Sequence, residues 1–271
     1  MKQWIMIIDV ARCHDCNNCF LACKDEHVDN DFPPYTYSMP KHGHRWRDID
    51  RVDKGSFPLI DVVYRAWNCM MCENAPCMKT GGDAMYRRDD GIVMIDPEKA
   101  KGRRDIMDAC PYGAIYWNDA LNIPQKCTFC AHLLDEGWTQ TRCSQVCATG
   151  ATTFRAVEPE EIGKLCTDEG LERYRDDFGT KPRIFYKNLG RFTKHFIAGS
   201  LILDGECCEN ASVTAEGNGV TKEAKSDGFG DFRVDGLEPG EYIVKIQYPG
   251  RNHAERSVTL EKSCNLGDIV L

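Results

Sequence analysis

The chain has 271 residues, 42% of them hydrophobic, which is enough for two globular domains. Its formal charge of −8 argues against nucleic acid as a partner. No run of about 18 apolar residues occurs, so we expect no membrane span, and no cleavable signal fits the N-terminus, so we expect a cytoplasmic location.

The first motif is a run of four cysteines. Residues 4–8 are strand-like and lead to Cys13, Cys16, Cys19 and Cys23, after which 20–26 has the character of a helix. Intervals of two, two and three residues are the spacing by which bacterial ferredoxins hold a 4Fe-4S cluster, and the fourth cysteine normally serves a second cluster. Such short spacing indicates metal binding by reduced thiols and not a disulfide scaffold.

Residues 29–61 form a long insert between the first two cysteine segments, and we expect it to be a loop. Loops of this length in compact domains tend to be functional. The insert contains Tyr35, Tyr37, Trp46 and Arg47, residue types that are enriched at protein interfaces. We therefore expect it to contact a partner protein, the alternative being that it only shields the metal sites from solvent.

Three further segments repeat the plan of a strand followed by ligands. Residues 64–68 precede Cys69, Cys72 and Cys77; residues 91–97 precede a segment ending in Cys110; residues 124–126 precede Cys127, Cys130, Cys143 and Cys147. Four segments predict two ferredoxin-like modules related by a pseudo-twofold axis, in which each loop takes its fourth ligand from the other segment of its module.

The rest of the chain has a different character. We expect a helix near 159–177, an extended stretch at 181–186 and then short strands separated by glycine turns, at 197–203, 211–215, 230–234, 241–247 and 257–260. This pattern predicts a small β-sandwich, and its turn sequences resemble prealbumin-like or carboxypeptidase-regulatory-like domains. The predicted fold is α+β, with an iron-sulfur domain at 1–195 and a sandwich at 196–271.

The order of the cysteine segments resembles the four-cluster iron-sulfur subunits of the dimethyl sulfoxide reductase family. In that family the first and fourth segments exchange ligands, as do the second and third. The resemblance implies three complete ligand sets. Set A is Cys13, Cys16, Cys19 and Cys147; set B is Cys127, Cys130, Cys143 and Cys23; set C is Cys69, Cys72, Cys77 and Cys110.

The fourth set of the family is absent. Its ligand positions correspond to Gly81, Ala100, Arg103 and Ile106, which we call the vacated positions. All four ligands of one cluster are missing while the other twelve remain, so we expect three 4Fe-4S clusters. By the family's pairing, the lost cluster would lie between the set A and B pair and set C, leaving a gap in the relay.

Zinc is the alternative for one group of cysteines. Taken alone, Cys127, Cys130, Cys143 and Cys147 fit a tetrahedral zinc site as well as an iron-sulfur cluster. The spacing of the first run and the isolated Cys110 favour iron-sulfur chemistry. The remaining cysteines, Cys166, Cys207, Cys208 and Cys264, have no ligand spacing and are expected to be structural thiols.

The combination of a missing cluster with an added sandwich resembles small subunits of pyrogallol-phloroglucinol transhydroxylases and of anaerobic hydroxylases of phenols such as resorcinol. The resemblance implies a large partner subunit with molybdenum and a pair of molybdopterin guanine dinucleotides, in a heterodimer or higher oligomer. No catalytic residue is expected in this chain. The alternatives are an electron-transfer subunit of another molybdenum or tungsten oxidoreductase, and a stand-alone polyferredoxin carrier.

Overall fold

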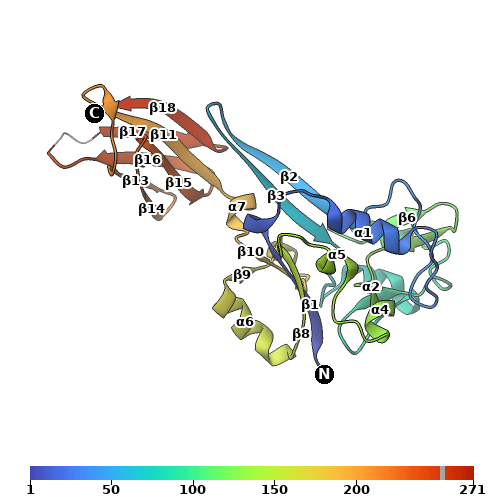
Figure 1. Cartoon of the computed structure of the whole chain (residues 1–271). Coiled ribbons are helices and arrows are strands. Elements are labelled where there is room, and N and C mark those ends of the chain that lie inside the picture. The colour runs from blue at the N-terminus through green and yellow to red at the C-terminus, as the bar shows by residue number, and fades with distance from the viewer. Residues whose placement is uncertain (251–253) are drawn as a thin grey trace. The chain divides into compact units, whose positions relative to one another are not determined.

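The computed structural model describes residues 1–250 and 254–271. Contacts within the chain divide it into two compact units. The first unit contains residues 1–50 and 64–189, and the second contains residues 51–63 and 190–271. Figure 1 shows the helices and strands of both units with their labels.

A four-stranded sheet forms one part of the first unit, in the order β8-β1-β10-β9. Its strands are β1 (Gln3–Asp9), β8 (Thr152–Val157), β9 (Leu171–Glu172) and β10 (Ile184–Lys187). β1 is central: Met6 pairs with Phe154 of β8 in antiparallel register and with Ile184 of β10 in parallel register. The apolar run predicted at 4–8 is therefore a strand. It pairs with β8 and β10, two strands from the C-terminal part of the first unit.

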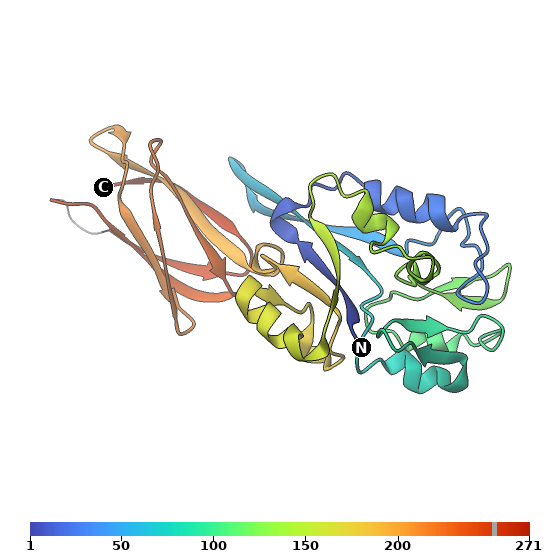
Figure 2. The ribbon, with the colours of Figure 1, turned by 60° about the horizontal axis from the view of Figure 1, so that its bottom comes forward.

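Successive side chains of β1 point to opposite faces of this sheet. Ile5 and Ile7 belong to a buried cluster with Phe185, against which Ile162, Leu165 and Cys166 pack. These three residues belong to α6 (Ile162–Glu169), the yellow helix beside the sheet in Figure 2. Met6 and Ile8 are also fully buried, so the opposite face is covered as well. The sheet thus has α6 on the face of Ile5 and Ile7. On the face of Met6, the side chain of Arg47 contacts the sheet.

The cysteine-bearing part consists of short elements. Its helices are α1 (Asn18–His27), α2 (Pro76–Gly81), α3 (Asp105–Asp108), α4 (Ala131–Asp135) and α5 (Arg142–Gln145), and its hairpins pair β4 (Met85–Arg87) with β5 (Val93–Ile95) and β6 (Tyr116–Asn118) with β7 (Ile123–Gln125). Single 3-10 turns occur at Val10–Arg12, Gly82–Ala84, Pro159–Glu161 and Asp176–Phe178. This matches the predicted α+β class.

The insert expected to be a loop contains a long strand. Residues Arg47–Ser56 form β2, which pairs with β3 (Leu59–Asn68) as a hairpin. The base of this hairpin belongs to the first unit, and its tip, residues 51–63, belongs to the second. The sequence of β2 does not predict a strand, because it is rich in charged residues and buried and exposed positions do not alternate along it.

The helix expected near 159–177 is shorter than predicted. α6 ends at Glu169, because Gly170 caps it in the left-handed conformation with φ 61°. The chain then enters β9, whose Leu171 pairs with Lys187 of β10. A glycine at this position favours the left-handed cap over another helical turn.

The second unit is a β-sandwich that follows the short helix α7 (Gly190–Thr193). One sheet has β11 (His195–Leu203) between β15 (Asp231–Leu237) and the parallel strand β18 (Cys264–Val270), with β12 (Glu206–Cys207) on β11. The other sheet has the order β14-β13-β16-β17, from β13 (Ser212–Gly217), β14 (Val220–Lys225), β16 (Gly240–Gln247) and β17 (Ala254–Leu260). The sequence pattern predicts five of these strands and misses β12, β14 and β18.

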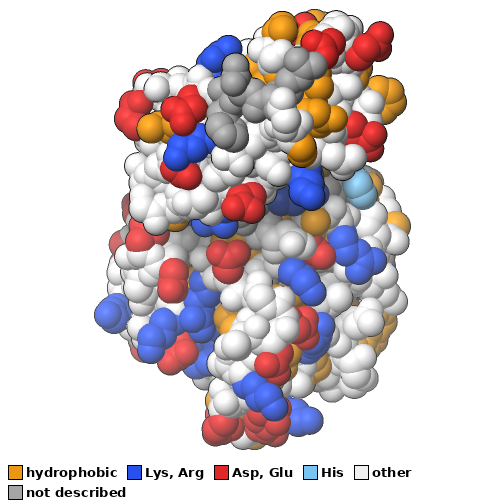
Figure 3. Space-filling view, turned by 90° about the vertical axis from the view of Figure 1, so that its left-hand side faces the viewer, with side chains coloured by type: hydrophobic (Ala, Val, Ile, Leu, Met, Phe, Trp, Pro, Cys, Tyr) orange, Lys and Arg blue, Asp and Glu red, His pale blue; other side chains and the backbone are white. Residues whose placement is uncertain are grey.

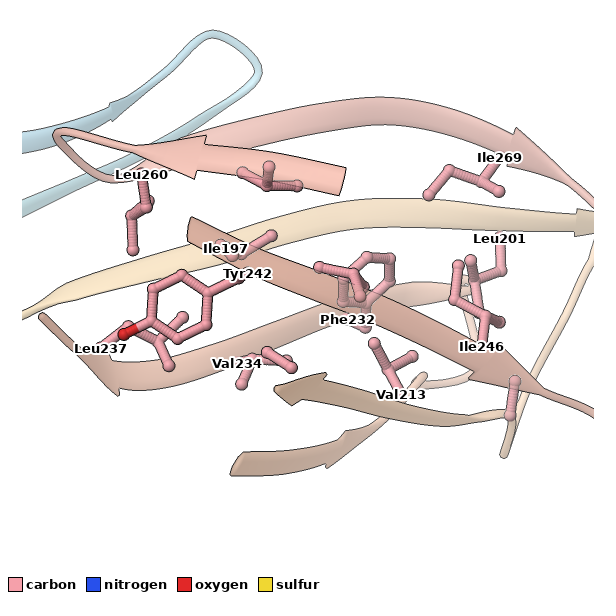
Figure 4. Packing of buried hydrophobic residues seen from close by; sticks show 14 of the residues in the cluster. Ile197, Leu201, Val213, Phe232, Val234, Leu237, Tyr242, Ile246, Leu260 and Ile269 are labelled. Atoms are coloured by element: carbon pink, nitrogen blue, oxygen red, sulfur yellow. The ribbon is translucent and has the colours of Figure 1, made fainter. Parts of the chain in front are cut away.

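The two sheets of the sandwich enclose an apolar core (Figure 4). Ile197 and Phe232 contribute from one sheet, and Val213, Tyr242 and Ile246 contribute from the other. On the face shown in Figure 3, acidic and basic side chains are interspersed, so the basic ones form no continuous surface there. Among residues 1–250 and 254–271, no helix is long and apolar enough to cross a membrane.

Candidate metal centres

A strand leads into each of the three cysteine loops. β1 precedes Cys13, β3 precedes Cys69 and β7 precedes Cys127. Each loop contains a non-glycine residue with positive φ: Asp15 at 53°, Met71 at 48° and Phe129 at 53°. Such conformations are uncommon for these residue types and gather at functional sites. They curl the backbone so that its N–H groups can face the enclosed space.

The cysteines of set A approach one another across the first unit. Burial raises the pKa of Cys13, and the charges of Cys19 and Cys147 raise it further. Cys147 follows α5 and lies next to the sheet, where the backbone N–H of Thr152 donates to its Sγ at 3.4 Å. Cys16, the remaining member, is exposed. Cys147 is therefore close to the first cysteine run although 124 or more positions separate it in sequence from Cys23 and earlier members.

Set B forms where α1 packs against α5. α1 carries Cys23 and α5 carries Cys143. Burial raises the pKa of Cys23 well above its ordinary value, and the next causes are the charges of Cys127, Cys130 and Cys143. These are the three partners that the ligand exchange predicts for Cys23.

Set C forms where α2, which carries Cys77, packs against α3, which ends just before Cys110. Burial raises the pKa of Cys72 to about 12, with further contributions from Cys69, Cys110 and Cys77. Burial also raises the pKa of Cys77 to about 12, and the charges of Cys69 and Cys110 raise it further. Cys110 has its partners in this set.

The four cysteines that could form a zinc ribbon are divided between two sets. Cys147 lies beside β8, where Thr152 donates to its Sγ, whereas Cys143 lies on α5, which packs against the helix that carries Cys23. In the described part of the chain, no three His, Cys, Asp or Glu side chains are close enough to hold a single metal ion. Cubane clusters need wider thiol spacing than one tetrahedral ion does, so the arrangement suits the clusters better than zinc.

Hydrogen-bond donors around the sulfurs also fit iron-sulfur ligands. Backbone N–H groups of Ala114 and Phe129 donate to the Sγ of Cys110 and Cys127, each at 3.4 Å. Thr141 Oγ1 lies 3.2 Å from Cys143 Sγ. Donors of this kind stabilise thiolates and tune the reduction potential of a cluster. The ligand sets therefore combine burial, thiols and donors as a cluster requires.

The vacated positions are packed with apolar atoms. A Cβ added at Gly81 would lie 2.6 Å from Cγ of Met85 and 3.3 Å from Cδ1 of Ile106. Ala100 and Ile106 are fully buried. Arg103 lies at the edge, where Nη2 donates to the carbonyl oxygen of Thr80 at 2.8 Å. Side chains of ordinary core residues occupy the space at these positions.

The expected order of the sets is wrong at one point. The charge of Cys69 in set C contributes to the raised pKa of Cys127 in set B, after burial and Cys143. Asn68, the neighbour of Cys69, donates from Nδ2 to Cys127 Sγ at 3.4 Å. Sets B and C are thus direct neighbours, and the vacated positions do not separate them. Local spacing could not reveal this order, since it depends on how the two modules pack.

The interface residues expected in the insert are partly buried within the chain itself. Trp46 and Arg47 are fully buried, so they do not present a surface to a partner. Tyr35 donates its hydroxyl to Asp135 at 2.5 Å and Tyr37 donates to Glu98 at 2.6 Å, so both hold the insert against its own unit. Arg47 and Asn68 belong to the site, and no sequence motif marked them as site residues.

Comparisons with known proteins agree with this arrangement. The family described as "4Fe-4S dicluster domain" matches residues 60–157, and the "Carboxypeptidase regulatory-like domain" matches residues 197–268. The chain is 46% identical to the "Pyrogallol hydroxytransferase small subunit" of Pelobacter acidigallici, and the match covers 100% of both chains. The predicted order of an iron-sulfur domain and a β domain of this type is therefore confirmed.

Two further relatives match the iron-sulfur part. A protein of Halobacterium salinarum described as an iron-sulfur subunit of dimethyl sulfoxide reductase is 32% identical over 69% of this chain and 80% of its own length. A selenate reductase subunit of Mesobacillus selenatarsenatis is 30% identical over 68% of this chain and 71% of its own length. Both matches leave about a third of this chain uncovered.

Proposed function

Since the chain belongs to the iron-sulfur subunits of the dimethyl sulfoxide reductase family, we propose that sets A, B and C each hold one 4Fe-4S cluster. Bound clusters would supply one-electron transfer. The observation that supports the proposal is the packing of α1, which carries Cys23, against α5, which carries Cys143, because a ligand exchange between these two segments requires it. The protein is in this view an electron-transfer subunit.

Chemical analysis tests the cluster count. Anaerobically purified protein should contain about twelve iron atoms and about twelve acid-labile sulfides per chain, since each cubane has four of each. A value near sixteen would contradict the vacancy at Gly81, Ala100, Arg103 and Ile106. Stoichiometric zinc with little sulfide would refute the cluster proposal.

We propose further that the partner is a large subunit that contains molybdenum and a pair of molybdopterin guanine dinucleotides. Full-length similarity to a protein named as a hydroxytransferase small subunit supports this, because the similarity includes the sandwich domain as well as the cysteine segments. The proposed reaction of the complex is transfer of a hydroxyl group from pyrogallol to phloroglucinol. This chain would contribute no catalytic group to that reaction.

The arrangement of the sets suggests how the subunit serves such a reaction. The three sets form a series with set B in the middle. The charge of Cys19 in set A acts on Cys143 in set B, and the charge of Cys69 in set C acts on Cys127 in set B. The vacated positions next to set C are filled by Met85 and Ile106. Hydroxyl transfer between two phenols involves no net oxidation, so the sets would adjust the redox state of the partner's metal and need not pass electrons onward.

Isolation of the complex distinguishes the alternatives. A transhydroxylase subunit should co-purify with a large molybdenum-containing chain, and the complex should convert pyrogallol and phloroglucinol without an external electron acceptor. Activity that requires an external acceptor would favour another molybdenum or tungsten oxidoreductase. Recovery of this chain alone with its full iron content would favour a stand-alone polyferredoxin. We propose the cytoplasm as its location, because the twelve cysteines of sets A, B and C must stay reduced to hold clusters.

A further inference from the structure

Arg47 is a buried guanidinium among neutral hydrogen-bond acceptors. It opens β2, and its side chain is 1% exposed. Nη1 donates to Oδ1 of Asn68 at 2.8 Å and to Sδ of Met6 at 3.4 Å, and Nη2 donates to Oγ1 of Thr152 at 2.6 Å. These partners lie on β3, β1 and β8, so three strands fix the position of one cation.

A second buried arginine shows what is unusual about Arg47. Arg65 is 4% exposed and forms an ion pair with the carboxylate of Asp50. Its guanidinium also lies 3.8 Å from the ring centroid of Tyr174. Arg47 has neutral partners in place of a carboxylate, and in the described part of the chain its Nε has no hydrogen-bond partner. A buried cation without a counterion is costly.

The charged groups that raise the pKa of Arg47 most are the thiolates of two cysteines from different sets. Burial opposes the charge of Arg47, but the thiolates of Cys143 in set B and Cys19 in set A outweigh it and raise its pKa. Two hydrogen-bond bridges, through Asn68 and through Thr152, place Arg47 between sets A and B.

Hydrogen bonds extend this arrangement to the ligands. Thr152 accepts from Arg47 through its hydroxyl, and its backbone N–H donates to Cys147 of set A. Asn68 accepts from Arg47 through Oδ1, and its Nδ2 donates to Cys127 of set B.

We propose that Arg47 is the shared counterion of the two cluster sites formed by sets A and B, and that it raises the reduction potential of both. This inference rests on the proposed function. Each reduction adds a negative charge, and a fixed cation in a buried, weakly screened site stabilises the reduced form. Arg47 is thus a positioning and tuning residue, not a catalytic one.

Redox titration of the intact complex, followed by electron paramagnetic resonance, tests the role of Arg47. The variants are Arg47→Gln, which removes the charge; Arg47→Lys, which keeps it; and Asn68→Asp, which places a carboxylate against the guanidinium. Arg47→Gln should lower the midpoint potentials of the clusters in sets A and B more than that of set C. Asn68→Asp should lower the potential of set A, which residue 68 does not contact; its effect on sets B and C is not used, because residue 68 adjoins Cys69 and contacts Cys127. Arg47→Lys should keep potentials nearer to those of the unaltered complex.

Arg155→Gln is the matched control, because Arg155 is a surface residue of the same unit, paired with Glu169 at 2.6 Å. It makes the same change in net charge and should leave all three potentials unchanged. An equal shift in Arg155→Gln and Arg47→Gln would overturn the proposal, as would unchanged potentials in Arg47→Gln with full iron content. If Arg47→Gln does not fold, an unchanged potential of set A in Asn68→Asp overturns it. Failure of the cluster assignment itself would appear separately, in the iron and sulfide content of the unaltered protein.

Discussion

Asn68 donates a hydrogen bond from Nδ2 to the Sγ of Cys127 at 3.4 Å, and the next residue in the chain is Cys69. One short segment thus connects a ligand of set B with a ligand of set C. Through Oδ1 the same side chain accepts from Arg47, whose charge acts on set A. The three sets are therefore linked in one continuous series inside the first unit.

Cysteine substitutions should show which ligands share a cluster. Cys23→Ser and Cys143→Ser belong to set B, so both should abolish the same paramagnetic resonance signal, although the two positions lie far apart in the sequence. Cys147→Ser belongs to set A and should abolish a different signal. Each variant should lose about four of about twelve iron atoms.

Cys166→Ser provides the control for these substitutions, because Cys166 is a half-buried thiol on α6 outside all three sets. It should keep the full iron content and every signal. Loss of the same signal from Cys143→Ser and Cys147→Ser, with Cys23→Ser unaffected, would instead assign the last four cysteines to one cluster and contradict the ligand exchange.

Ile106 should be important for stability, because it fills space at the vacated positions. Ile106→Ala removes a fully buried side chain next to Gly81 and should lower the free energy of unfolding by about 2–5 kcal/mol. Leu121→Ala is the control in the same unit: Leu121 is 38% exposed, and its substitution should change stability by less than about 0.5 kcal/mol. Anaerobic denaturant unfolding measures both, and equal effects would contradict the packing described here.

The sandwich offers a matched pair of isoleucines on one strand. Ile246 of β16 is fully buried in the core, whereas Ile243 is 44% exposed. Ile246→Ala should destabilise the second unit by about 2–5 kcal/mol, and Ile243→Ala should have a much smaller effect. Neither change should alter the iron content, because all twelve proposed ligands lie in the first unit. Iron loss in Ile246→Ala at temperatures where the sandwich remains folded would contradict this separation.

His27 should make stability depend on pH. Burial lowers the pKa of His27 from 6.5 to about 3, with a smaller contribution from His132, so the folded state keeps it neutral while the unfolded chain can bind a proton. Its contribution is complete above pH 6.5 and is lost as the pH falls toward 3. Between about pH 7.5 and 5.5 the loss should be about 1.4 kcal/mol.

The measurement is the free energy of unfolding at several pH values for the unaltered protein and for His27→Leu. Leucine binds no proton. Between about pH 7.5 and 5.5 the free energy of unfolding of the variant should therefore fall by about 1.4 kcal/mol less than that of the unaltered protein. Only the difference between the two slopes is informative, since burial also lowers the pKa of His44 and His195. Parallel slopes would show that His27 is accessible to protons in the folded state.

Much of the fold could be predicted because its signals are local. The apolar run that forms β1 precedes the first ligand loop, and the short intervals between cysteines bring each group of three together within one loop. The exchange of Cys23 and Cys147 between loops follows from the family resemblance. Its geometric support in the structure comes from the packing of α1 on α5, which the spacing alone could not give.

The missed features depend on residues far apart in the chain. β18 lies parallel to β11, with Ile197 opposite Cys264, and no turn signal connects the two strands. The interpretation of Arg47 as an interface residue is wrong because exposed arginine is the common case and this one is buried. Its hydrogen-bond partners Thr152 and Asn68 lie 105 and 21 positions away in the sequence, so no local pattern around β2 reveals its burial.

The β2–β3 hairpin has a practical consequence for dividing this protein. Its tip, residues 51–63, completes the second unit: Lys54 donates to the carbonyl oxygens of Arg191 and Lys194, and Asp61 accepts from Arg233 at 2.7 Å. A cut after Leu189 would therefore leave part of the sandwich's packing on the other fragment. Neither half can be expressed as a complete module by truncation alone, and a separately produced sandwich would need the hairpin tip grafted back onto it.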